Sequence, residues 1–194
     1  LHTNLEQNQN RKLFFLVAMP RSGNTLFASI MNQNPEIAAT PNSITLEIMK
    51  DLFLLKQTDV FLNYPDHKSL NNVLDIVYDT YYKDWPQRII IDRGPVMTVG
   101  NLQLMKKHYK RPFKCMIMNK DGAVAKDLDA IKNAYNYPDI CHFVKYDDMV
   151  TNPEQEFKKI YKFLNEPYFN HRFNNLDQVC VNGLSYDDTI VGSN

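Results

Sequence analysis

The sequence predicts a three-layer α/β fold, in which helices cover both faces of a mostly parallel sheet. Short continuous apolar runs recur along the chain and suit strands that are buried on both faces. Segments with apolar residues at helical spacing separate these runs, as expected for parallel strands joined by helices. The 194 residues, of which 44% are hydrophobic and 23% charged, are enough for one well-packed domain, residues 1–194.

The first strand, loop and helix form the most informative unit. Residues 13–18 are apolar, and the sequence Met-Pro-Arg-Ser-Gly-Asn-Thr then breaks the run. Apolar residues resume at helical spacing, so a helix is expected to open near residues 22–25. Unpaired backbone N–H groups and the positive end of the helix dipole make such a terminus suitable for a phosphate-like anion.

The residue types in this loop fit an anion site. Arg21 supplies a charged fork for paired oxygens, and Gly23 allows close approach of the backbone. Ser22, Asn24 and Thr25 add side-chain donors. The alternative is a proline–glycine turn that joins strand to helix, with Ser22 or Thr25 as its N-cap. The Walker pattern of P-loop NTPases is absent.

The remaining elements follow in order. After a short strand at 36–39, Asn42 or Ser43 is expected to cap a helix. The expected helices are 44–55, 69–82, 97–108, 123–134 and one from a cap at 151–154 to residue 164, and the further strands are 88–92, 113–118 and 139–144.

The two ends of the chain carry weaker patterns. Residues 1–11 are polar and are expected to form a flexible arm. Residues 170–194 lose clear periodicity, and residues 182–185 are expected to form a loop. The absence of a clear last helix fits either a truncated chain or a naturally minimal domain.

Composition limits the classes of function. The formal net charge is zero, so nothing in the overall charge indicates a nucleic-acid partner. The three cysteines form no metal or disulfide pattern, and free buried thiols indicate a reducing, cytoplasmic location. No His/Cys cluster suggests a metal, and no apolar stretch reaches membrane-spanning length.

Four segments resemble sulfotransferases, and on the first two the chain is identified as a member of that family. Residues 20–25, Pro-Arg-Ser-Gly-Asn-Thr, resemble the 5'-phosphosulfate loop, Pro-Lys/Arg-Ser-Gly-X-Thr. Residues 146–154, Tyr-Asp-Asp-Met-Val-Thr-Asn-Pro-Glu, are similar to the family's Tyr-Glu-Asp-Leu/Met-Val-X-Asp-Pro-Glu. Residues 92–95 resemble its second loop, and residues 119–122 resemble its 3'-phosphate segment. The resemblance implies a P-loop-like version of the predicted fold.

The resemblance implies a donor, 3'-phosphoadenosine 5'-phosphosulfate (PAPS), and transfer of its sulfuryl group without a metal. Arg21 would stabilise the leaving phosphate, and residues 22–25 would cradle it. Arg93 would contact the sulfuryl group, Lys120 the 3'-phosphate and Tyr146 the adenine. The acceptor would be a hydroxyl or amine of a small molecule, saccharide, lipid or peptide. Neither the acceptor nor the oligomeric state can be read from the sequence.

The general base is a separate question. Family members use a histidine in the second loop or a glutamate after the first helix, and neither stands at its position here. A base must reach the acceptor proton and be unprotonated at working pH. Glu47 and Asp92 are the expected candidates.

Two other functions stay open. A catalytically impaired protein that binds PAP, the desulfated donor, or another nucleotide fits the missing base and Leu26, which replaces an adenine-stacking aromatic of cytosolic relatives. A small-molecule kinase with a divergent phosphate loop is the third reading. The absent Walker lysine counts against it, and Mg²⁺-dependent ATP binding would favour it.

Overall fold

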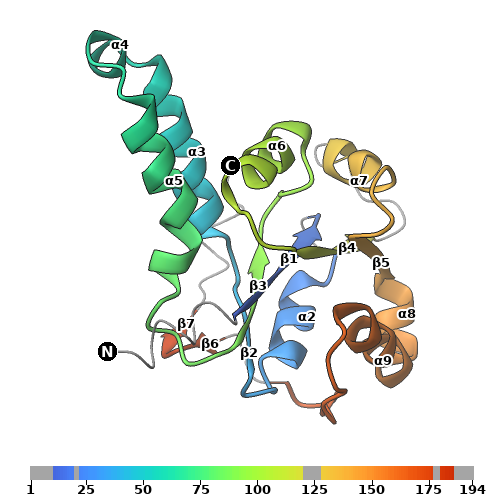
Figure 1. Ribbon diagram of the computed structural model, residues 1–194. Helices are drawn as coiled ribbons and strands as arrows, with labels where there is room; N and C mark the ends of the chain where they lie inside the picture. The colour runs from blue at the N-terminus through green and yellow to red at the C-terminus, as the bar shows by residue number, and fades with distance from the viewer. Residues whose placement is uncertain (1–10, 20–21, 120–127, 177–179, 186–194) are drawn as a thin grey trace.

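A computed structural model describes residues 11–19, 22–119, 128–176 and 180–185 (Figure 1). Its centre is a five-stranded parallel sheet with the strand order β2-β3-β1-β4-β5. The strands are β1 Lys12–Ala18, β2 Ile37–Ala39, β3 Ile89–Arg93, β4 Lys114–Asn119 and β5 Cys141–Lys145. The five apolar runs therefore form the predicted strands, with boundaries shifted by one or two residues.

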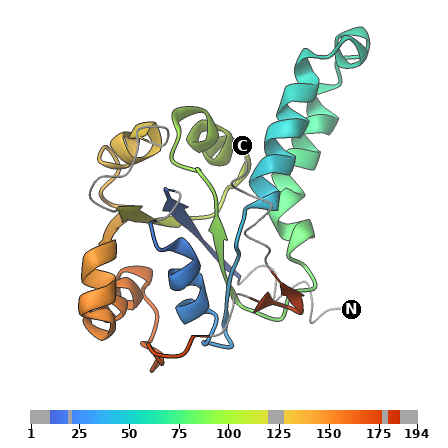
Figure 2. The same cartoon turned by 180° about the vertical axis from the view of Figure 1, so that it is seen from behind.

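Helices cover both faces of this sheet, which confirms the predicted three-layer α/β fold. One face carries α2 Asn24–Met31, α8 Tyr146–Thr151 and α9 Pro153–Leu164, and the other carries α6 Val99–His108 and α7 Leu128–Ala134 (Figures 1 and 2). Phe27 of α2 stacks on Phe157 of α9 at a ring distance of 5.6 Å. Of the predicted helix 123–134, residues 123–127 lie outside the described residues.

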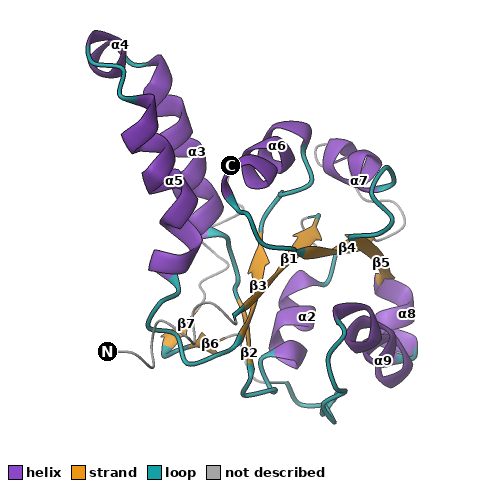
Figure 3. Cartoon of the chain, in the orientation of Figure 1, coloured by secondary structure: helices purple, strands orange, loops and turns teal. Residues whose placement is uncertain are grey.

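The helices α3 Ile44–Leu54 and α5 His67–Tyr81 form an arm that projects from the α6 side of the molecule (Figure 3). The short helices η1 Leu55–Gln57 and α4 Asp59–Asn63 connect them at the tip. Of the two predicted caps, Ser43 is the one that caps α3, because its hydroxyl accepts a hydrogen bond from the Leu46 N–H at 3.0 Å.

The short elements α4, α8, β6 and β7 were not predicted. Residues 59–63, for which no element was expected, form α4, and the residues after β5 form α8 directly. Residues 182–185 were expected to form a loop, but Leu184–Ser185 is strand β7, paired antiparallel with β6 Cys180–Val181. Elements of two to six residues are too short to show a hydrophobic period, which explains these errors.

His171 packs beside α9 and links the segment after this helix to the core. It is 6% exposed and lies among aromatic rings, and its Nε2 is 3.0 Å from the Tyr161 hydroxyl. Burial lowers the pKa of His171 to about 4.

This low pKa predicts that the protein loses stability in mild acid. Between pH 6.5 and 4 the unfolded chain protonates His171 while the folded chain does not, so stability falls as pH falls, by up to about 3 kcal/mol. Urea unfolding at pH 7, 5.5 and 4 measures this slope. In His171→Phe the loss of stability between pH 7 and pH 4 should be smaller by this amount. An equal slope in both proteins would contradict the assignment.

Candidate functional site

The carboxyl ends of the parallel strands bring the predicted site segments together. Ala18 of β1 lies beside Met118 of β4, and Met118 lies beside Val144 of β5. The loop after β1 and the start of α8 therefore leave the sheet next to each other. Ligands of open α/β sheets bind at this edge, because the loops that follow the strands converge there.

The loop after β1 turns tightly into α2. Ser22 is buried, and its hydroxyl donates to the Met19 carbonyl oxygen at 2.7 Å. Gly23 is the N-cap of α2 and has a φ of 85°, a left-handed conformation that favours glycine. Ser22 thus braces the loop from inside, which differs from its predicted role as a donor to an anion.

Gly23 lies directly against Tyr146, the first residue of α8. A Cβ atom on Gly23 would be 2.4 Å from Tyr146 Cδ2 and 3.0 Å from Met149 Cε. Real Cβ atoms do not approach that closely, so only glycine fits. Two residues predicted for the donor site, 123 positions apart in the sequence, are therefore in contact.

The first turn of α2 offers donors to an anion. Asn24 is 6% exposed, its Oδ1 accepts from the Thr25 N–H at 3.0 Å, and its Nδ2 has no hydrogen-bond partner among the described residues. Thr25 is exposed, and the turn contains no carboxylate to offset the helix dipole. A buried amide donor without an acceptor is costly, which favours a site that is completed by a ligand.

Asp92, at the end of β3, is fully buried and holds a network of hydroxyl groups. Its Oδ1 accepts from Thr40 Oγ1 at 3.0 Å, and its Oδ2 accepts from Ser43 Oγ and Thr45 Oγ1, both at 2.6 Å. Burial raises the pKa of Asp92, and the hydroxyl donors oppose the rise. Sequence reasoning missed Thr40 and Thr45, although a cluster of hydroxyl residues around Pro41 was visible.

This network fixes the segments that carry two other predicted residues. Ser43 caps α3, whose first turn contains Glu47, and the Arg93 N–H donates to Thr40 Oγ1 at 3.1 Å. Glu47 is exposed and pairs with Lys50 at 2.7 Å. Asp92 itself has 0% exposure and both oxygens occupied, so an acceptor has no open path to it.

Three other residues were predicted for the site, namely Arg93, Arg21 and Lys120. Arg93 is half-buried at the end of β3. Arg21 and Lys120 lie outside the described residues. Within the described part of the chain, no group of three His, Cys, Asp or Glu side chains could hold a metal ion. No helix in that part is both long and apolar enough to cross a bilayer.

A comparison with known protein families gives a match over more than half of the chain. A family model described as "Sulfotransferase domain" matches residues 72–182, more than half of the chain. That match covers Asp92, Arg93, Lys120 and Tyr146 and begins after the loop at residues 20–25. A comparison with curated protein sequences gave no match.

Solved structures with similar folds include two sulfotransferase domains. One comes from the olefin synthase of Synechococcus PCC 7002, with a TM-score of 0.56, 18% identity and coverage of 82% of this chain and 75% of that one. The other, from the curacin biosynthetic pathway, has a TM-score of 0.50, 16% identity and the same coverage. A mouse sulfotransferase, SULT7A1, complexed with PAP, has a TM-score of 0.48 and 12% identity over 87% of this chain and 65% of that one. At these identities the first two likenesses show the three-layer fold.

Proposed function

Because this chain belongs to the sulfotransferase family, we propose that it transfers the sulfuryl group of PAPS to a hydroxyl or amine acceptor. The observation that carries the proposal is the contact of Gly23 with Tyr146 at the N-terminus of α2. This contact joins the loop that resembles the 5'-phosphosulfate loop to a segment that the family model covers.

The proposed reaction is an in-line displacement at sulfur. The acceptor oxygen or nitrogen forms a bond to sulfur while the bond from sulfur to the bridging oxygen of the 5'-phosphate breaks. The electron pair stays on that oxygen, so PAP leaves with an added negative charge, and the acceptor loses its proton to a base. Catalysis then consists mainly of positioning and of stabilising this charge.

The chain supplies groups for both tasks. We propose that the N-terminus of α2, the Asn24 amide and Thr25 bind the phosphosulfate and that Arg21 adds the positive charge. We propose that Tyr146 forms the adenine side of the site and that Arg93 and Lys120 contact the sulfuryl group and the 3'-phosphate.

For the base, the difference in burial between the two candidates supports a choice. Glu47 is exposed, whereas Asp92 is fully buried and accepts hydrogen bonds from three hydroxyl groups. We therefore propose Glu47 as the base and Asp92 as a positioning residue that holds the start of α3. A PAP-binding protein without transfer activity is the second candidate, favoured by the burial of Asp92. PAP binding without transfer of ³⁵S from labelled PAPS to hydroxyl or amine acceptors would support it.

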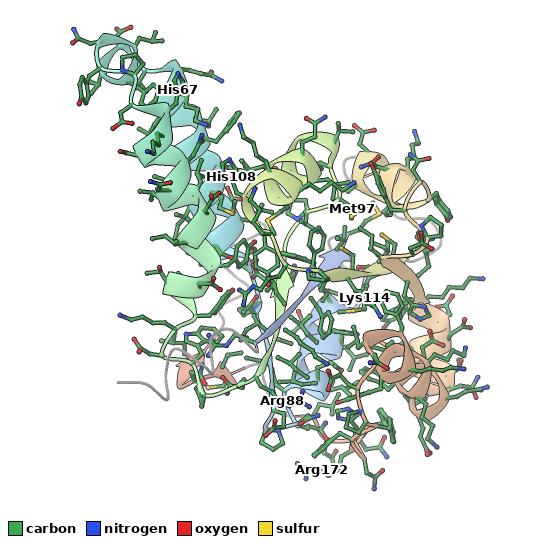
Figure 4. All side chains as sticks on the ribbon, viewed as in Figure 1. His67, Arg88, Met97, His108, Lys114 and Arg172 are labelled. Atoms are coloured by element: carbon green, nitrogen blue, oxygen red, sulfur yellow. The ribbon has the colours of Figure 1, made fainter. Side chains whose placement is uncertain are left out.

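Calorimetric titration with PAP tests the donor assignment. We expect micromolar binding that weakens about 10- to 100-fold in Arg21→Ala, because a charge-assisted contact to phosphate contributes about 1.5–3 kcal/mol. Arg172→Ala is the matched control, since Arg172 follows α9 far from the start of α2 (Figure 4). If PAP binds no better than ATP with Mg²⁺, or binds Arg21→Ala equally well, the donor assignment is wrong.

A further inference from the structure

We propose a second ligand site, in which three buried sulfur atoms bind a Cu(I) ion. The ligands are the thiols of Cys115 and Cys141 and the thioether of Met97, which together form the sulfur cluster. Met97 and Cys141 are 44 residues apart in the sequence, so no local spacing of ligands indicates a metal. The fold brings the three residues together, on two paired strands and on the segment that precedes α6.

Strand pairing places the two cysteines side by side. Cys115 of β4 and Cys141 of β5 are partners in the parallel register. Neighbouring strands are about 4.8 Å apart, and register partners project their side chains from the same face of the sheet. The Cys115 N–H donates to the Ile140 carbonyl oxygen at 2.7 Å, which fixes the start of β5 against β4. The two thiols also share a hydrogen bond, which lowers the pKa of Cys141.

Met97 supplies the third sulfur, and its Sδ is 3.9 Å from Cys141 Sγ. A metal–sulfur bond is about 2.3 Å long, so two sulfurs that share one ion at an angle of about 120° are about 4.0 Å apart. The observed separation therefore fits two ligands of a common ion. Asn133 of α7 donates to the Met97 carbonyl oxygen at 2.8 Å and so holds the backbone of this ligand in place. Figure 4 shows Met97 between the sheet and the helices α6 and α7.

The ligand types select a soft ion with a single charge. Thiolate and thioether ligands together favour Cu(I), whereas structural Zn(II) takes four ligands from cysteine, histidine and carboxylate side chains. In the described part of the chain, no His, Asp or Glu joins the two thiols in a group that could hold a metal ion.

Burial of the sulfur cluster favours the same ion. Met97 and Cys115 are 0% exposed, and Cys141 is 7% exposed. One thiolate makes Cu(I) neutral but leaves Zn(II) with a net charge, and a net charge is costly in a position without water.

The sulfur cluster is separate from the proposed donor site. Its contacts with Met97 and Asn133 place it on the face of the sheet that carries α6 and α7, whereas Gly23 begins α2 on the other face (Figures 1 and 2). Cu(I) and PAP should therefore bind to the same molecule without competition.

The test titrates the protein with Cu(I) without oxygen, in competition with bicinchoninate, whose coloured copper complex reports the ion that the protein does not hold. The reference protein is Cys180→Ser, because Cys180 is an exposed thiol outside the sulfur cluster. We expect Cys180→Ser to retain one Cu(I) per chain, and excess Zn(II) should not displace it. X-ray absorption spectra should show only sulfur ligands, at about 2.3 Å.

Substitutions in this reference protein locate the ligands. Cys115→Ala and Cys141→Ala should each weaken Cu(I) binding at least about 100-fold, since loss of a group that only orients a ligand already costs about 10- to 100-fold. Met97→Leu nearly keeps the side-chain volume and should weaken binding about tenfold. Met116→Leu changes a buried methionine of β4 that lies outside the sulfur cluster, and should leave binding unchanged. Circular dichroism and thermal melting check that each variant is folded.

The proposal is overturned if Cys180→Ser does not retain Cu(I) against bicinchoninate, if Zn(II) displaces the ion, or if Cys115→Ala and Cys141→Ala bind it as tightly as Cys180→Ser. Should the alanine variants fail to fold, the X-ray absorption spectrum of Cys180→Ser decides. A shell of three sulfurs supports the site, and nitrogen or oxygen ligands contradict it. Neither result depends on PAP, so this test and the PAP titration can fail separately.

Discussion

Gly23→Ala is expected to abolish PAP binding and to destabilise the fold by about 2–5 kcal/mol. The new methyl group meets the Tyr146 ring at 2.4 Å, and the φ of 85° disfavours any residue with a Cβ. Left-handed backbone costs about 1–2 kcal/mol for alanine, and overpacking costs about 1–3 kcal/mol more. Relief of the clash must move the loop or α8, and either movement opens the proposed donor site. Urea unfolding and PAP calorimetry measure the two effects.

A second substitution and a matched control separate the causes. In Gly23→Ala/Tyr146→Ala the ring is gone, so the overpacking part of the loss should be recovered while the backbone part remains. Gly100→Ala, in the exposed first turns of α6 with nothing within 4 Å of the new Cβ, should be neutral or slightly stabilising. If Gly23→Ala retains full stability and PAP affinity, the close contact with Tyr146 does not exist in solution.

Asp92→Ala is expected to have the larger effect on stability, about 3–5 kcal/mol. The substitution leaves the buried hydroxyls of Thr40, Ser43 and Thr45 without their shared acceptor. Each hydrogen bond to a charged group contributes about 1.5–3 kcal/mol and a cavity also forms, but removal of the carboxylate also removes its desolvation cost, so the net loss is smaller than the sum of these contributions. The start of α3 and the second loop should loosen together, because both are fixed by this carboxylate. Urea unfolding at pH 7 measures the change.

Asp92→Asn is the informative comparison, because it keeps the volume and one acceptor oxygen while it removes the charge. Its loss of stability should be clearly smaller than that of Asp92→Ala. A loss below about 0.5 kcal/mol in Asp92→Ala, the size of an ordinary surface change, would show that the network does not stabilise the fold. The positioning role proposed for Asp92 would then be wrong.

The sheet and most of the helices could be predicted from sequence because their signals are local. The apolar run of β1 and the break after it lie within a few residues of each other. The Ser43 hydroxyl that caps α3 likewise lies only three residues from the N–H that it accepts from. In contrast, α4 and the β6–β7 hairpin are too short to carry a period, so their pairing depends on contacts that no local pattern records.

The candidate site was predictable only in part, for a similar reason. Sequence patterns placed polar residues at the strand ends, and the fold brings Gly23 and Tyr146 into contact there. The environment of Asp92 was not predictable, because its three donors come from positions 47 to 52 residues earlier in the chain. A carboxylate after a strand looks the same in sequence whether it faces a substrate or a buried network.

The most direct test of the donor site is a backbone amide spectrum of ¹⁵N-labelled protein recorded with and without PAP. The proposed site predicts shifts of the Gly23, Asn24, Thr25 and Tyr146 amides. The amides of Lys114 and Asn165, near the amino-terminal ends of the strands, should be unchanged. Shifts confined to these amino-terminal ends, or no shifts at saturating PAP, would contradict the assignment of the donor to the N-terminus of α2.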